Sequence, residues 1–227
     1  MFRASAPRTL RCMSMKRVLV GFVPWIVFTL VATRLGPGAV GVACVLAFVV
    51  AVGLVVRSVS RGESPKLLEV TGAAVFLGLA VVAAAVPGVD GVLADYGRAL
   101  AAAILAAVIF ALLPVMPFTE QYARESVPRE YWHTAEFRSI NRRISAAWGG
   151  VVAVMALSHA VAGTVEVPDP GVGPLHRPVD LAFNWIIPGL LVWAAAGYTR
   201  RVSGERGSVP TARGPVAPQG VHERGSR

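Results

Sequence analysis

The chain has 227 residues, of which 55% are apolar and only 15% are charged, and its formal net charge is +9 at pH 7. A soluble globular domain carries about 25% charged residues, so this composition excludes an ordinary soluble domain and indicates a polytopic membrane protein. The two cysteines, Cys12 and Cys44, form no CxxC motif, which excludes a redox or metal site built on that motif.

Lysine and arginine are distributed unevenly between the segments that flank six apolar stretches. Nineteen of the 22 lie in the first, third, fifth and seventh flanking segments, whereas Arg34, Arg98 and Arg177 lie singly in the three segments between them. Cytoplasmic loops of membrane proteins are enriched in these residues. The alternation predicts six membrane spans with the N-terminus and the C-terminus in the cytoplasm. Attraction to anionic lipids explains the positive charge without a nucleic-acid partner.

The first apolar stretch, 18–34, follows a basic leader over 1–17 that we place in the cytoplasm. A helix needs about 20 mostly apolar residues to cross a bilayer, so this stretch is the first predicted span. We expect Pro24 to bend it, because proline cannot donate the backbone hydrogen bond of an inner helical turn. A tight turn over 36–38 follows, so the second span, 39–57, runs antiparallel to the first.

The other four spans are predicted at 66–86, 94–113, 140–162 and 179–199. Ser64 is the predicted N-cap of the third span, with Pro65 in its first turn. The cytoplasmic segment 114–139 connects the fourth span to the fifth, and Pro188 lies near the middle of the sixth. The basic tail, 200–227, has few apolar side chains and is predicted to be disordered. The apolar runs do not alternate as barrel strands do, so the predicted fold is an all-α bundle of about six transmembrane helices.

Small residues recur at every fourth position in three of the predicted spans. These rows are Ala39, Ala43, Ala47 and Ala51 in the second span, Ala99, Ala103, Ala107 and Ala111 in the fourth, and Ser145, Gly149 and Ala153 in the fifth. Residues four apart share one helical face, and small faces let helix backbones approach closely in lipid. We therefore expect packing seams on these faces, with chance rows in alanine-rich helices as the alternative.

The sequence lacks the motifs of familiar membrane enzymes, since it contains no HExxH, GxSxG or GxGxxG. No Asp, Glu, Lys or Arg lies near the middle of a predicted span, where ion-coupled transporters usually place one. The sequence therefore favours a non-enzymatic protein without a cofactor or a metal site over an ion-coupled transporter or an enzyme.

Polar side chains gather at the outer ends of the last two spans. Ser158 and His159 end the fifth span, and His176, Asp180 and Asn184 lie just before or within the first turns of the sixth. Histidine and carboxylate together can bind a metal or move a proton. The candidates for an outer-face site are His159, His176 and Asp180. The alternative is structural, because an acid at a helix N-terminus is stabilised by the helix dipole.

The segment 118–143 holds the densest mixture of charged and aromatic residues in the chain. Glu120 and Arg124 are four apart, which supports a short helix, and Pro128 ends that helix. The candidate docking or lipid-headgroup residues are Arg124, Trp132, Asn141, Arg142 and Arg143. The alternative is a linker that lies flat on the bilayer and is anchored by its aromatic side chains.

This segment resembles a group of uncharacterised bacterial integral membrane proteins. The resemblance rests on Phe118-Thr119, Tyr122-Ala123-Arg124-Glu125, Val127-Pro128, Trp132, Asn141-Arg142 and Trp148. The spacing of Arg138, Asn141 and Trp148 also distantly resembles intracellular septation protein A, which is usually drawn with five spans. The resemblance implies a multi-pass protein of the bacterial cytoplasmic (inner) membrane and no particular activity.

Three functions remain open at this stage. The first is a scaffold or accessory protein that uses 118–143 to bind anionic lipid headgroups or a cytoplasmic or membrane protein partner. The second is a small-molecule or lipid transporter, suggested by the prolines in spans one and six. The third is a lipid-acting enzyme that uses the outer histidine and aspartate residues. A solidly packed bundle would favour the scaffold. A cavity that reaches the midplane would favour the transporter. A tight cluster of His159, His176 and Asp180 would favour the enzyme.

Overall fold

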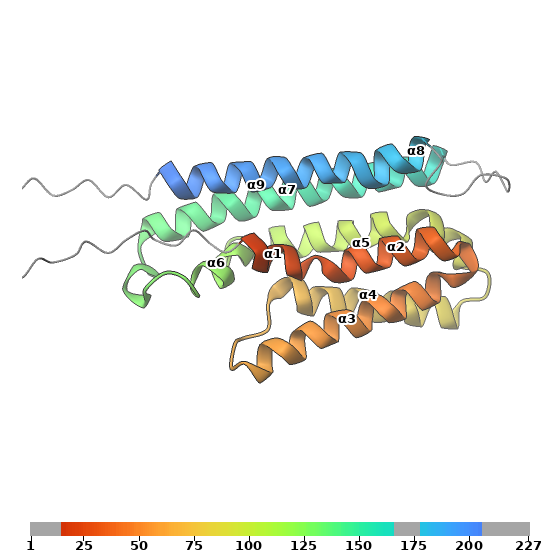
Figure 1. The fold of residues 1–227 in the computed structure, drawn as a ribbon, viewed down its shortest axis with the longest axis horizontal. Coiled ribbons are helices and arrows are strands. Elements are labelled where there is room, and N and C mark those ends of the chain that lie inside the picture. The colour runs from red at the N-terminus through yellow and green to blue at the C-terminus, as the bar shows by residue number, and fades with distance from the viewer. Residues whose placement is uncertain (1–14, 166–177, 206–227) are drawn as a thin grey trace, which may run out of the picture.

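A computed structural model describes residues 15–165 and 178–205, and these residues form helices and short connections without a strand (Figure 1). Five helices are long and apolar enough to cross a membrane, namely α3 (Val40–Ser60), α4 (Leu67–Ala85), α5 (Asp90–Leu112), α7 (Ala135–Val165) and the helix over Pro178–Ser203. The protein is therefore an all-α polytopic membrane protein, as predicted.

The first predicted span is divided into α1 (Met15–Gly21) and α2 (Val23–Leu35). Pro24 lies in the first turn of α2, where its missing N–H group cannot continue the hydrogen bonds of α1. The bend predicted at Pro24 is confirmed, and α2 by itself is a short apolar helix. After α2, Gly36 adopts a φ of +78° and Gly88 a φ of +79° between α4 and α5, conformations that favour glycine.

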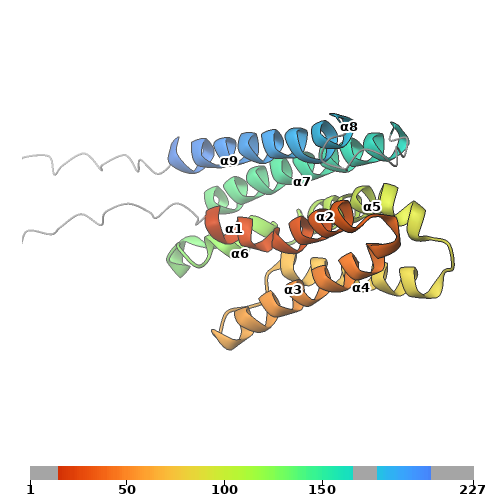
Figure 2. The ribbon, with the colours of Figure 1, turned by 45° about the vertical axis from the view of Figure 1, so that its right-hand side comes forward.

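The helices lie in three layers along the bundle. Helices α3 and α4 form one outer layer, α1, α2 and α5 lie in the middle, and α7 and α9 (Ile187–Glu205) form the other outer layer (Figures 1 and 2). The start of α1, the α3–α4 connection, the start of α7 and the end of α9 lie together at one end. This end carries Arg57, Arg61, Arg142 and Arg143, and we call it the basic end.

Three predicted boundaries are wrong by several residues. Helix α1 begins at Met15, inside the predicted leader, and α9 continues to Glu205, inside the predicted disordered tail. The rest of the leader and of the tail lies outside the described residues. Helix α7 begins at Ala135, before the predicted start at 140, and its 31 residues give a length of about 46 Å. Because the hydrocarbon core is about 30 Å thick, α7 is longer than a membrane span requires, and its charged residues all lie in its first turns, at the basic end.

The N-terminus of α4 also differs from the prediction. Lys66 is the N-cap in place of Ser64, and its backbone N–H donates to Oε2 of Glu69 at 3.2 Å. The side chain of Glu69 thus fulfils the capping role in the first turn. The helix starts two residues later than Pro65 would place it.

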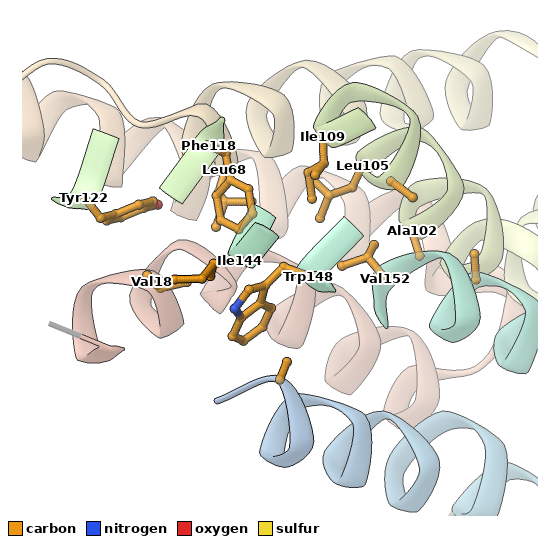
Figure 3. Close-up of a cluster of buried hydrophobic side chains, with 13 residues drawn as sticks. Val18, Leu68, Ala102, Leu105, Ile109, Phe118, Tyr122, Ile144, Trp148 and Val152 are labelled. Carbon is orange, nitrogen blue, oxygen red and sulfur yellow. The ribbon is translucent and has the colours of Figure 1, made fainter. Parts of the chain in front are cut away.

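Two hydrophobic clusters form the core. One surrounds the fully buried Trp148 and joins α1, α4, α5, α6 (Phe118–Ala123), α7 and α9 through Val18, Leu68, Ile109, Phe118, Ile144 and Ala195 (Figure 3). The indole N–H of Trp148 donates to Oγ1 of Thr199 at 3.1 Å, which ties α7 to α9. The other cluster joins α2, α3, α4 and α5 around Phe28 and Phe76.

The predicted small-residue rows are largely buried on α3 and α7 and largely exposed on α5. In α3, Ala43, Ala47 and Ala51 are fully buried, and in α7, Ser145 and Gly149 are buried with Ala153 half-buried. A Cβ atom added to Gly149 would lie 3.0 Å from Cγ2 of Ile109, so α5 and α7 approach closely there.

In α5 most of the predicted seam is exposed. Ala99 is buried, but Ala103, Ala107 and Ala111 are exposed, whereas Ala102 and Ala106 are buried on a neighbouring face. This helix has alanine on all of its faces, so several rows at a spacing of four could have formed the packing seam. The neighbouring helix α7 decides which of them is buried.

Candidate functional site

The segment after α5 is folded back onto α7 by a buried hydrogen-bonded joint. The hydroxyl of Thr119 in α6 donates to the carbonyl of Asn141 at 3.0 Å and lies 2.8 Å from the hydroxyl of Ser145. The amide Nδ2 of Asn141 donates to the carbonyl of Phe137 at 2.9 Å. Asn141 is buried, so this predicted docking residue belongs to the joint and is not on the surface.

Arg124 and Trp132 stabilise the loop that follows α6. The guanidinium of Arg124 donates to Oε1 of Glu120 at 2.6 and 3.0 Å and lies 5.0 Å from the centre of the Trp132 ring. Arg129, in the short helix η2 (Arg129–Tyr131), lies 5.6 Å from the same ring. The indole N–H donates to the carbonyl of Val127 at 2.9 Å. These contacts hold the loop in a compact form at the surface. Arg124 uses its guanidinium within this loop, for Glu120 and Trp132.

Arg142 and Arg143 have a different environment from the other predicted site residues. Both side chains are exposed, while Ile144 and Ser145 next to them are buried. Neither arginine forms an ion pair with a described residue. They lie among the charged residues of the first turns of α7, where they are accessible from outside the bundle.

Sequence reasoning missed a cleft of about 190 Å³ at the same end of the bundle. Its lining includes Arg57, Arg61, Glu63 and Tyr122, together with the apolar side chains of Val20 and Leu54. Helices α1, α3, α4 and α6 meet here. The sequence signal that could have indicated a site is the pair Arg57 and Arg61, which are four residues apart at the end of a span.

Polar contacts between helices hold the cleft in shape. Lys66 forms an ion pair with Glu125, which joins the start of α4 to the end of α6. The backbone N–H of Leu67 donates to Oε1 of Gln121 at 2.8 Å. The hydroxyl of Ser58 in α3 donates to Oε2 of Glu69 at 3.0 Å.

Two of the three outer-face candidates lie in a buried polar chain at the opposite end. His159 Nδ1 donates to Oδ1 of Asn184 at 2.6 Å, and Nδ2 of Asn184 donates to Oδ1 of Asp180 at 2.7 Å. Nη1 of Arg98 lies 3.6 Å from the same Asp180 oxygen, and both side chains are buried. The sequence assigned Arg98 to an outer connection, but it lies more than two turns inside α5. His176 lies outside the described residues.

A π-helical turn supports this polar chain. It spans Ala182–Ile186, between α8 (Pro178–Leu181) and α9, and here the N–H of Ile187 donates to the carbonyl of Ala182. Pro188 has no N–H, so the carbonyl of Phe183 loses the donor that a π turn would supply. The hydroxyl of Ser158 in α7 donates to that carbonyl at 2.6 Å. Pro188 thus interrupts the backbone hydrogen bonds of this helix, and Ser158 of α7 supplies a donor to the carbonyl of Phe183.

The chemistry of the two ends follows from these contacts. His159 reaches Asp180 only through Asn184, and no group of three His, Cys, Asp or Glu within 15–165 and 178–205 could hold a metal ion. Exposed, accessible cations lie at the basic end, whereas the polar chain at the opposite end is buried.

No family model, curated protein or solved structure matches the chain.

Proposed function

We propose that this protein is a non-enzymatic accessory protein of the bacterial inner membrane whose basic end faces the cytoplasm and binds anionic lipid headgroups. The observation that supports it is the placement of Arg142 and Arg143, which are exposed on the charged first turns of α7, a helix longer than a membrane span requires. Each basic residue near an anionic membrane surface contributes about 1 kcal/mol. The two neighbouring arginines therefore form a site of modest, salt-sensitive affinity.

The surface around the two arginines is fixed in place. The joint of Thr119, Asn141 and Ser145 holds α6 against α7, and the stack of Arg124 on Trp132 holds the loop between them. A linker that only anchors the chain to the bilayer needs aromatic and basic side chains but no such joint. The joint therefore favours a docking surface over a simple anchor.

Lipid retention tests the proposal. Arg142→Lys with Arg143→Lys keeps the charge but removes the fork of donors that matches a phosphate. We expect the purified double variant to retain less anionic lipid, measured by mass spectrometry of co-purified lipid at increasing salt. Arg200→Lys with Arg201→Lys is the matched control, because both residues are exposed at the same end on α9. Equal retention by wild type and both variants would contradict the proposal.

Cysteine labelling tests the orientation. In a background lacking Cys12 and Cys44, a cysteine at Asp90 should react with an impermeant maleimide in intact cells, because the outer connections carry few basic residues. A cysteine at Gly62, in the α3–α4 connection, should not react. The reverse pattern would place the basic end outside the cytoplasm and contradict the proposal.

A second function, a transporter, is favoured by the buried pair of Arg98 and Asp180 beside a π turn. Charged groups inside membrane spans often mark ion or substrate pathways, and π turns are frequent at functional sites. Proton movement through reconstituted protein, followed with a dye trapped in vesicles and lost in Asp180→Asn, would support this function. Vesicles that stay as tight as protein-free ones would leave the pair with a structural role.

A further inference from the structure

The cleft at the basic end is lined by three cations, Arg57, Arg61 and Lys66, and by two carboxylates, Glu63 and Glu69. Arg57, in the last turn of α3, and Arg61, its C-cap residue, line the cleft from the same end of the helix. Like charges four residues apart at a helix end repel one another. Neither arginine has an ion pair with any residue of the described ranges. The α3 dipole stabilises cations near this helix end, but it does not relieve the repulsion between them.

The carboxylates of the cleft have partners of their own. Glu69 Oε2 accepts from the hydroxyl of Ser58 and from the backbone N–H of Lys66. Glu63 also lines the cleft and has its own contacts. Lys66 is neutralised by Glu125. The two arginines are therefore the groups in the cleft that an anion would stabilise most.

Tyr122 adds a hydrogen-bond donor to the same cleft. Its side chain is only 3% exposed, and its hydroxyl has no hydrogen-bond partner in the described part of the chain. Burial raises the pKa of this hydroxyl, and the nearby charges of Glu69 and Glu125 raise it further, so it keeps its proton. A buried donor without an acceptor is unfavourable, and a ligand oxygen that enters the cleft as far as this hydroxyl, beside Gly21 of α1, would correct this.

The size and depth of the cleft restrict the ligand. Its volume of about 190 Å³ is below the roughly 300–1,000 Å³ of pockets for drug-sized ligands. Helix α3 has 21 residues, so it is about 31 Å long, close to the thickness of the hydrocarbon core. Arg57, in its last turn, and Arg61 therefore lie at the level of lipid phosphates. The apolar walls formed by Val20 and Leu54 continue this site toward the acyl chains.

We propose that this cleft binds a phosphate group, with Arg57 and Arg61 donating charge-assisted hydrogen bonds and Tyr122 donating a third. Guanidinium groups match the oxygens of phosphate in geometry and charge. The phosphate is carried by a phospholipid of the same leaflet or is free in solution. The site shares no residue with the surface of Arg142 and Arg143 and stands independently of the function proposed above.

The first test measures binding of dioctanoyl phosphatidic acid to the full chain in an uncharged detergent. Arg57→Gln with Arg61→Gln should lower the affinity at least about tenfold, since two charge-assisted hydrogen bonds are lost. Arg200→Gln with Arg201→Gln removes the same charge from the same end and should bind as wild type does. An equal loss in both double variants would show only general charge attraction and overturn the proposal.

Tyr122→Phe provides a second test that does not depend on the arginine variants folding. Because the hydroxyl has no partner, its removal should leave Tm without lipid unchanged or higher. The stabilisation on adding phosphatidic acid should fall, with a loss of affinity of about tenfold. Phosphatidic-acid affinity equal to that of wild type would overturn the three-donor site.

Two further ligands identify the source of the phosphate. Dioctanoylglycerol lacks the phosphate and should not bind, so binding as strong as that of phosphatidic acid would overturn the proposal. Inorganic phosphate that stabilises the protein as well as the lipid does would assign the site to free phosphate. Stabilisation by phosphatidic acid that inorganic phosphate neither reproduces nor displaces would assign it to a lipid headgroup.

Discussion

The two ends of the bundle place their arginines differently. At the basic end, Arg142 and Arg143 are exposed, as are Arg57 and Arg61 of the cleft, whose third cation, Lys66, is buried in its ion pair with Glu125. At the other end, Arg98 and Asp180 are buried between helices and face one another at 3.6 Å. A charge removed from water requires a nearby partner, whereas an exposed charge is stabilised by solvent and lipid headgroups. Exposed cations therefore suit binding, and buried pairs suit structure or transport.

The largest expected effect is at the buried pair. Asp180→Ala removes the carboxylate that faces Arg98 and the acceptor of the Asn184 amide, so we expect a loss of about 3–5 kcal/mol in the free energy of unfolding. Asp95→Ala, at an exposed position on α5, should be mild. Both variants can be compared by denaturant titration in detergent, and similar stability would show that the buried pair contributes little.

A smaller loss is expected where α5 and α7 touch near the same end. A Cβ added at Gly163 would lie 2.6 Å from the backbone oxygen of Asp95, which cannot rotate away. Gly163→Ala should therefore destabilise the protein by about 1–3 kcal/mol through overpacking. Gly150→Ala is the control, since its added Cβ meets nothing within 4 Å and alanine favours a helix. Thermal unfolding of both variants would separate the contact from helix propensity.

The alanine rows offer a matched pair of substitutions. Ala47→Leu places a larger side chain in a fully buried position of α3 and should cost about 1–3 kcal/mol. Ala107→Leu adds the same atoms on an exposed face of α5 and should change stability by about 0.5 kcal/mol or less. An equal loss at both sites would mean that the face of α5 carrying Ala107 packs against something beyond this chain.

The smallest change in stability is expected at the basic end. Arg142→Lys with Arg143→Lys should alter the free energy of unfolding by about 0.5 kcal/mol or less, because both side chains are exposed. The same variant should lose anionic lipid, as proposed above. A large loss of stability would show that these arginines, like Arg98, are part of the folded bundle and would remove the contrast between the two ends.

The fold class, the approximate positions of the spans and the bend at Pro24 could all be predicted from the sequence. These features depend on local properties, because twenty apolar residues span a bilayer wherever they occur and proline interrupts a helix in any context. The exposure of Arg142 and Arg143 and the pairing of Glu120 with Arg124 also follow from positions along a single helix.

The faces on which the spans pack together could not all be predicted from the sequence. In water, an apolar stripe marks the buried face of a helix, but in a bilayer the lipid-facing side is apolar as well. The sequence of α5 therefore could not distinguish Ala107 from Ala106. For the same reason, the approach of Arg98 to Asp180, the burial of Asn141 and the cleft around Tyr122 required the packing of helices distant in the chain.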